Sequence, residues 1–129
     1  MRRFAGIWVS HSLALTVQTD GQAIASWRVY KWCGPGVSPP CDTMRGSNID
    51  AGGQAKLTFT GADGASLKGQ ITGSNVRDQW PIGSTITFVL QPYGLARLFG
   101  GNGRLDYTLC GPDFANAPPD VARSVPCGA

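Results

Sequence analysis

Residues 21–41, GQAIASWRVYKWCGPGVSPPC, form the stretch that decides the fold. The first half alternates like one long β-strand, in which successive side chains point to opposite faces. One face would carry Ile24, Ser26, Arg28, Tyr30 and Trp32, and the other would carry Ala25, Trp27, Val29, Lys31 and Cys33. The second half is a Gly/Pro-rich loop closed by a second cysteine. The strand is unusually rich in aromatic residues, which indicates a binding role as well as a structural one.

Seven further segments show the same period of two, and most are bounded by turn residues such as Asp20-Gly21. They are residues 4–10, 13–19, 54–60, 65–73, 84–91, 95–99 and 104–110. Eight strands with one apolar row each are typical of an up-and-down antiparallel barrel, in which no edge stays open. The sequence therefore predicts a single all-β barrel domain over residues 1–129. A two-sheet sandwich of the same strands is the alternative.

Two segments lack any period. Residues 34–53 contain Pro39-Pro40 and Gly52-Gly53 and are predicted to be a long loop, with a lid or a short helical turn over residues 42–51. Residues 111–129 are rich in proline and are predicted to be an irregular tail tied down by a disulfide.

Composition excludes several classes of protein. Hydrophobic residues make up 42% of the chain, which suffices for a core, while 18 Gly and 9 Pro suit many turns. The net charge of +3 is scattered without a basic run, so we expect no nucleic-acid partner. No apolar run reaches the length of about 18 residues that a membrane span requires, so no transmembrane segment is expected.

The four cysteines are expected to form two local disulfides, Cys33–Cys41 and Cys110–Cys127. Neither spacing fits a zinc site, and we expect no metal and no cofactor. Disulfides persist in oxidising compartments, which predicts a secreted or cell-envelope protein whose export signal is absent from this sequence. A cytosolic protein with four free thiols is the alternative.

Gly6-Ile7-Trp8 on the first strand resembles the Gly-x-Trp signature of the calycins, the lipocalin and avidin-like barrels. The resemblance implies that Trp8 packs at the closed end of the barrel with an arginine across it, either Arg97 or Arg104. A longer pattern resembles small exported actinobacterial proteins of unassigned function; it comprises Gly6 to Trp8, Asp20-Gly21, Trp27 to Cys33, Pro39 to Asp42, and Leu109 to Pro112. This resemblance implies export and a compact β fold, and it carries no catalytic residues.

Catalysis is not expected. His11 is the only histidine and would need Asp42 or Asp106 beside it to act as a base, whereas an exposed turn residue explains it more simply. Glu is absent, and nothing in the sequence marks a pair of aspartates for hydrolysis.

The leading functional hypothesis is a small apolar or amphiphilic ligand bound in the barrel lumen. Its wall would be Trp8, Arg28, Tyr30 and Trp32, an apolar surface with polar handles. These side chains could instead fill the core, or Trp32, Trp80 and Tyr93 could form an exposed rim patch. The alternative function is a protein-interaction module, an inhibitor or envelope component, that presents the rigid loop over residues 34–41 to a protein partner.

Overall fold

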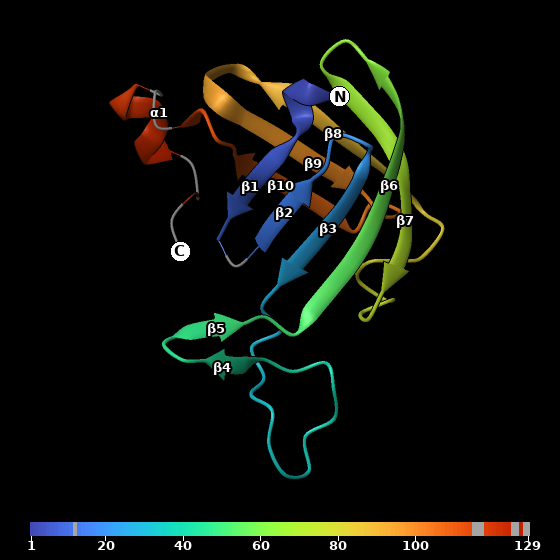
Figure 1. Ribbon diagram of the computed structural model, residues 1–129, viewed down its shortest axis with the longest axis vertical. Coiled ribbons are helices and arrows are strands. Elements are labelled where there is room, and N and C mark those ends of the chain that lie inside the picture. The colour runs from blue at the N-terminus through green and yellow to red at the C-terminus, as the bar shows by residue number, and fades with distance from the viewer. Residues whose placement is uncertain (12, 115–117, 125–126, 128–129) are drawn as a thin grey trace.

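Eight antiparallel strands close into a barrel in the computed structural model, which describes residues 1–11, 13–114, 118–124 and 127 (Figure 1). Around the barrel the order is β1-β10-β9-β8-β7-β6-β3-β2. The bounds are β1 (Gly6–Ser10), β2 (Leu13–Val17), β3 (Gln22–Trp27), β6 (Gly53–Asp63), β7 (Ser66–Ser74), β8 (Thr85–Gln91), β9 (Leu95–Gly100) and β10 (Leu105–Cys110). The predicted barrel is confirmed, and the two-sheet sandwich is excluded.

One apolar row from each strand points inward, as the alternation predicts. The rows of β2, β6, β7, β8 and β10 are those expected, with Leu15, Leu57, Leu67, Ile86 and Leu109 fully buried. On β3 the inward row is Ala23, Ala25 and Trp27, whereas Ile24 is 43% exposed. β3 also ends at Trp27, six residues before the predicted end at Cys33. The prediction that Arg28, Tyr30 and Trp32 line the lumen is therefore wrong.

Aromatic rings fill the end of the barrel nearer the N-terminus. A short 3-10 helix, η1 (Arg2–Phe4), buries Phe4 there, and the Trp8 indole N–H donates to the Phe4 carbonyl at 2.9 Å. Trp8 meets the Phe88 ring edge-on, with centroids 5.1 Å apart. The arginine expected across Trp8 is a wrong prediction. Arg97 lies over Phe99 and pairs with Asp106, and Arg104 donates to the Asp78 carbonyl.

A second aromatic group fills the opposite end. Trp27 stacks on Trp80 at a centroid distance of 4.6 Å, and Trp80 is followed by Tyr107 at 6.2 Å. Trp80 is fully buried, which excludes the alternative of an exposed rim patch formed by Trp32, Trp80 and Tyr93. The interior of the barrel is a packed core, and the Trp27–Trp80–Tyr107 stack forms its floor toward the end that we call the mouth.

Residues 28–52 leave the barrel wall between β3 and β6 and project beyond the mouth, at the end of the barrel away from the N-terminus (Figure 1). This 28–52 segment contains a two-stranded hairpin, β4 (Thr43–Arg45) and β5 (Asn48–Asp50), in place of the predicted lid or helical turn.

The remaining short elements are η2 (Pro92–Gly94) and α1 (Pro119–Ser124), a single-turn helix in the tail that was predicted to be irregular. Both predicted disulfides are confirmed: the Cα atoms lie 5.1 Å apart in Cys33–Cys41 and 5.6 Å apart in Cys110–Cys127. None of the described helices has the length and apolar character needed to cross a bilayer.

Candidate functional site at the barrel mouth

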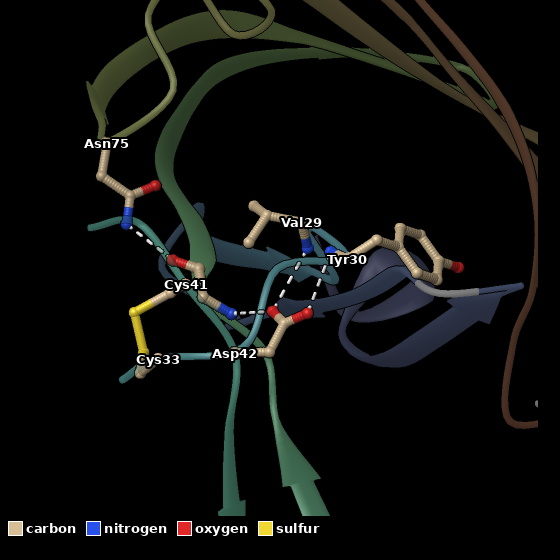
Figure 2. The surroundings of a disulfide bond; sticks show 7 residues. Val29, Tyr30, Cys33, Cys41, Asp42 and Asn75 are labelled. Atoms are coloured by element: carbon tan, nitrogen blue, oxygen red, sulfur yellow. Dashed lines mark hydrogen bonds between the residues drawn. A yellow bond between two sulfur atoms is a disulfide. The ribbon is translucent and has the colours of Figure 1, made fainter. Parts of the chain in front are cut away.

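A fully buried carboxylate, that of Asp42, organises the 28–52 segment. Its oxygens accept hydrogen bonds from the backbone N–H groups of Val29 at 3.2 Å, Tyr30 at 2.9 Å and Gly52 at 2.8 Å. Arg28 Nε adds an ion pair at 3.2 Å. Figure 2 shows the nitrogens of Val29 and Tyr30 converging on the two oxygens, while the Tyr30 ring points away from the disulfide. One side chain thus ties the beginning of the segment to its end.

These contacts determine the charge state of Asp42. Burial opposes ionisation, but the hydrogen bonds from Gly52, Val29, Arg28 and Tyr30 together outweigh it and hold the pKa of Asp42 below its ordinary value. The backbone of Asp42 also bridges the chain, since its N–H donates to the Lys31 carbonyl and its carbonyl accepts from the Cys33 N–H. The Cys33–Cys41 disulfide closes the loop beside these bonds.

Two glycines allow the segment to sit this close to the barrel. A Cβ on Gly52 would overlap the backbone of Cys41, and a Cβ on Gly53 would overlap the Trp27 indole. Asn75 completes the join, because its side chain accepts from the Gln54 N–H and donates to the Gly52 carbonyl, each at 2.8 Å. The Gly52-Gly53 pair therefore serves close packing, and Gly53 begins β6.

Above this base lies an exposed group of Arg28, Tyr30 and Trp32. The guanidinium carbon of Arg28 lies 4.7 Å from the Tyr30 ring centroid and 5.1 Å from that of Trp32. Tyr30 is 63% exposed and Trp32 50% exposed. Tyr30 also has a φ of 59°, a left-handed conformation that is unfavourable for a residue other than glycine. Backbone strain of this kind persists where the surroundings enforce it and is concentrated at functional sites.

A cleft of about 610 Å³ opens at the mouth, and we call it the mouth cleft. Its apolar lining comes from the barrel strands, with Leu13, Trp27 and Tyr107, from Val76 between β7 and β8, and from Val29 and Pro40. Its polar lining comes mainly from the 28–52 segment. The full lining is His11, Leu13, Trp27, Arg28, Val29, Tyr30, Lys31, Pro40, Val76, Gln79 and Tyr107. Among the residues that the structure describes, none of those lining this cleft is acidic. Burial in this position raises the pKa of the Tyr107 hydroxyl.

A second cleft, of about 710 Å³, lies on the other side of Arg28 and Tyr30. It runs between the outer surface of β1–β3 and the hairpin, with Ile49 and Asp50 on the hairpin side and Ala14 and Ser26 on the barrel side. Arg28 and Tyr30 line both clefts, so this pair stands on the ridge between them.

The predicted site residues therefore separate into two places. Trp8 belongs to the core at the far end of the barrel, while Arg28, Tyr30 and Trp32 come together outside the mouth. His11 is exposed, as predicted, and lines the mouth cleft. Its suggested acids are engaged elsewhere, Asp42 by Arg28 and Asp106 by Arg97 at 2.9 Å. The described residues contain no group of His, Cys, Asp or Glu that could hold a metal ion.

Sequence reasoning missed three contributors to the site. Asp42 anchors the 28–52 segment, Tyr107 forms part of the cleft floor, and Asn75 joins Gly52 to the barrel through its side-chain hydrogen bonds. The position of Asp42, directly after Cys41 in a loop without a period, was a usable signal, because backbone N–H groups in such a loop need acceptors other than a strand partner. Tyr107 carried no such signal, since its inward position looks like any core residue.

Comparisons of the chain with protein-family models, with curated proteins and with solved structures gave no significant match. The functional argument consequently rests on the geometry of the mouth.

Proposed function

We propose that the mouth cleft binds an amphiphilic ligand that combines an apolar body with an acidic group. The observation that carries this proposal is the composition of the cleft: an apolar floor of Leu13, Trp27 and Tyr107 lies beneath a rim whose charged residues, Arg28 and Lys31, are both basic. Clefts of this size with an apolar floor and a few polar groups are typical of small-molecule sites. This proposal moves the ligand from the lumen, which side chains fill, to the mouth.

The rigidity of the rim supports a binding role. Asp42, the Cys33–Cys41 disulfide and the Gly52–Asn75 contact fix the 28–52 segment before any ligand arrives. A preorganised site loses less conformational entropy on binding and therefore binds more tightly. The ion pair with Asp42 engages Arg28 through Nε and holds its guanidinium group beside the cleft.

Tryptophan fluorescence tests the proposal, because Trp27 lies in the cleft floor. We expect decanoate to change the emission and to bind more tightly than decanol, which has the same chain length without the charge. Lys31→Gln should lower the affinity for decanoate by up to about fivefold, which is the contribution of one exposed ion pair, and should leave the affinity for decanol unchanged. Lys68→Gln, a charge change on the outer wall, is the matched control. Equal affinities for decanoate and decanol would contradict an acidic group, and no binding of either would refute the site.

A second function, a protein-interaction module, is favoured by a specific observation. Four of the large exposed apolar residues lie within the 28–52 segment: Tyr30, Trp32, Met44 and Ile49. Met44 and Ile49 are directly opposed across the hairpin, so they share one face. Large exposed apolar groups gathered on one projection mark interaction surfaces. A partner held there would be lost with Trp32→Ala or Met44→Ala and kept with Ile7→Ala, which removes an exposed apolar residue from the barrel wall.

We also propose that the protein works in an oxidising compartment, outside the cell or in the envelope. The two disulfide pairs support this location, because such bonds are rare in the cytosol. Mass spectrometry of the natively produced protein after thiol alkylation should find all four cysteines unmodified. Alkylated cysteines would contradict this location.

A further inference from the structure

The barrel is closed unevenly at the junction of its first and last strands. β10 pairs with β9 along all six of its residues, from Leu105 to Cys110. With β1 it pairs only at Cys110, opposite Val9. Because the two strands are antiparallel and β1 ends at Ser10, the earlier part of β10 continues beyond the end of β1. Within the described part of the chain, residues 105–109 of β10 therefore have no strand partner on that side.

The register shows which backbone groups face this open edge. The Gly111 N–H donates to the Gly94 carbonyl at 2.8 Å, in line with the β9–β10 pairing. In an antiparallel pair, hydrogen-bonded residues alternate with residues whose N–H and C=O groups point the other way. Leu105, Tyr107 and Leu109 are thus bonded to β9. Asp106 and Thr108 direct their N–H and C=O groups to the side where β1 is missing.

This open edge borders the mouth cleft. Tyr107, between Asp106 and Thr108, points inward and lines the cleft, and His11 and Leu13, around the turn after β1, line the same cleft. A chain lying along the edge would consequently pass over Tyr107 and toward the basic rim at Arg28 and Lys31. The part of β10 that lacks a strand partner among the described residues is therefore contiguous with the apolar floor.

We propose that the mouth cleft receives the end of an extended peptide, which adds as a short strand to β10. The backbone groups of Asp106 and Thr108 would form main-chain hydrogen bonds with it, an apolar side chain would rest on Trp27 and Tyr107, and the terminal carboxylate would lie at Arg28 and Lys31. This inference rests on the proposed function and names the chemical class of its ligand. Strand addition draws affinity from main-chain hydrogen bonds and specificity from pockets for alternate side chains.

A peptide suits these features better than a lipid does. A fatty acid satisfies the apolar floor and the basic rim, but once its carboxylate lies at the rim, its alkyl chain offers the strand edge no donors or acceptors. Charge complementarity determines which part of a peptide fits, because Arg28 and Lys31 are the charged residues among the described residues that line the cleft, and both are basic. Two residues, Asp106 and Thr108, direct their backbone groups to the open edge. This length limits the paired region to about three or four residues of the peptide.

Amide exchange and calorimetry test the inference with a defined probe, the tetrapeptide acetyl-Ala-Ala-Leu-Phe with a free C-terminus. Binding should slow hydrogen exchange at the amides of Asp106 and Thr108 at least tenfold. The amides of Leu105 and Tyr107, already bonded to β9, should change little. The C-terminal amide form of the peptide should bind more weakly than the free acid.

Backbone methylation gives the sharpest control. We compare two variants of the tetrapeptide, each N-methylated at one of two neighbouring amides. Only one variant should lose at least tenfold in affinity, because alternate N–H groups of an extended peptide face β10. Thr108→Pro, which removes an edge N–H not bonded to β9, should weaken the peptide and spare decanoate.

Each outcome decides the matter. Binding of decanoate without the peptide would overturn the inference and leave the proposed function intact, whereas binding of neither would refute both. The inference would also be overturned if both methylations weakened peptide binding equally, or if the Asp106 and Thr108 amides stayed unprotected from exchange. Either result would show that the peptide contacts the cleft without adding a strand. If Thr108→Pro does not fold, the two methylated peptides still test strand addition on the natural chain.

Discussion

At the scale of single residues, Asp42 has the largest structural effect outside the core. It takes the place of strand pairing at the two ends of the 28–52 segment, because its carboxylate accepts hydrogen bonds from three backbone N–H groups there, those of Val29, Tyr30 and Gly52. A buried charge is costly when it stands alone and acceptable when it is fully hydrogen-bonded and paired, as it is here with Arg28. The exposed rings of Tyr30 and Trp32 keep their positions because this buried group fixes the backbone beneath them.

Asp42→Asn should lower the free energy of unfolding by about 2–3 kcal/mol, because an amide offers one acceptor and turns a donor toward N–H groups that need acceptors. Urea unfolding followed by tryptophan fluorescence measures the loss. Asp106→Asn is the matched control, since Asp106 also pairs with an arginine but is exposed, and its loss should be clearly smaller. Equal losses in the two variants would contradict the anchoring role of Asp42.

At the scale of elements, the sequence predicted eight strands and the structure shows those eight, with different ends. The alternation of the strands is confirmed because one face of each strand meets the core, which penalises a shift by one residue. On β3 the buried face is that of Ala25 and Trp27, not the face of Ile24 that was predicted to line the lumen. β3 is the instructive exception. The alternation continues through Trp32, yet pairing ends at Trp27, because β6 begins opposite Trp27 at Gly53 and offers no partner beyond it. Alternation shows that a strand can form, and the partner determines how far it extends.

The Cys33–Cys41 disulfide belongs to the 28–52 segment, and its removal should act there. Replacing both cysteines by serine should cost about 2.5 kcal/mol on the chain-entropy estimate for a separation of 8 residues. The far-UV circular dichroism of the barrel should persist, while decanoate binding in the mouth cleft weakens. Removing Cys110–Cys127 is the control, because that bond ties down the tail and its cysteines do not line the mouth cleft. Undiminished decanoate binding after loss of Cys33–Cys41 would contradict a preorganised rim.

At the scale of the whole molecule, closure of the sheet determines where a ligand can go. Eight strands leave an interior that side chains can fill, and here two aromatic groups fill it from both ends. The cleft with the apolar floor therefore lies at the mouth, between the barrel and the 28–52 segment. The incomplete junction of β1 and β10 opens onto the same place.

The dependence of stability on pH is a property of the whole molecule that these contacts predict. The pKa of Asp42 is lowered by its hydrogen bonds in spite of burial, and that of Asp106 by the hydrogen bond from Arg97. A carboxyl group whose pKa is lower in the folded state stabilises the fold above its ordinary value of 3.8, and this stability is lost as the pH falls through the folded value. The free energy of unfolding should therefore fall below about pH 4.

Urea midpoints measured from pH 7 down to pH 2 test this dependence. Asp42→Asn should show a shallower fall than the natural chain, because one of the groups responsible is gone. An identical slope in both proteins would show that Asp42 has the same pKa folded and unfolded, contrary to the geometry.

The sequence by itself determined the fold class, the positions of most strands and both disulfides. These follow from a period of two, from turn residues and from local cysteine spacing, all of which act between near neighbours in the chain. It also singled out Arg28, Tyr30 and Trp32 as a group, which the structure brings together. Only the tertiary structure decided that these residues lie outside the barrel, because the end of β3 depends on where β6 begins. The same holds for the buried anchor Asp42, the cleft floor at Tyr107 and the open edge of β10, since each depends on contacts between segments that the sequence keeps far apart.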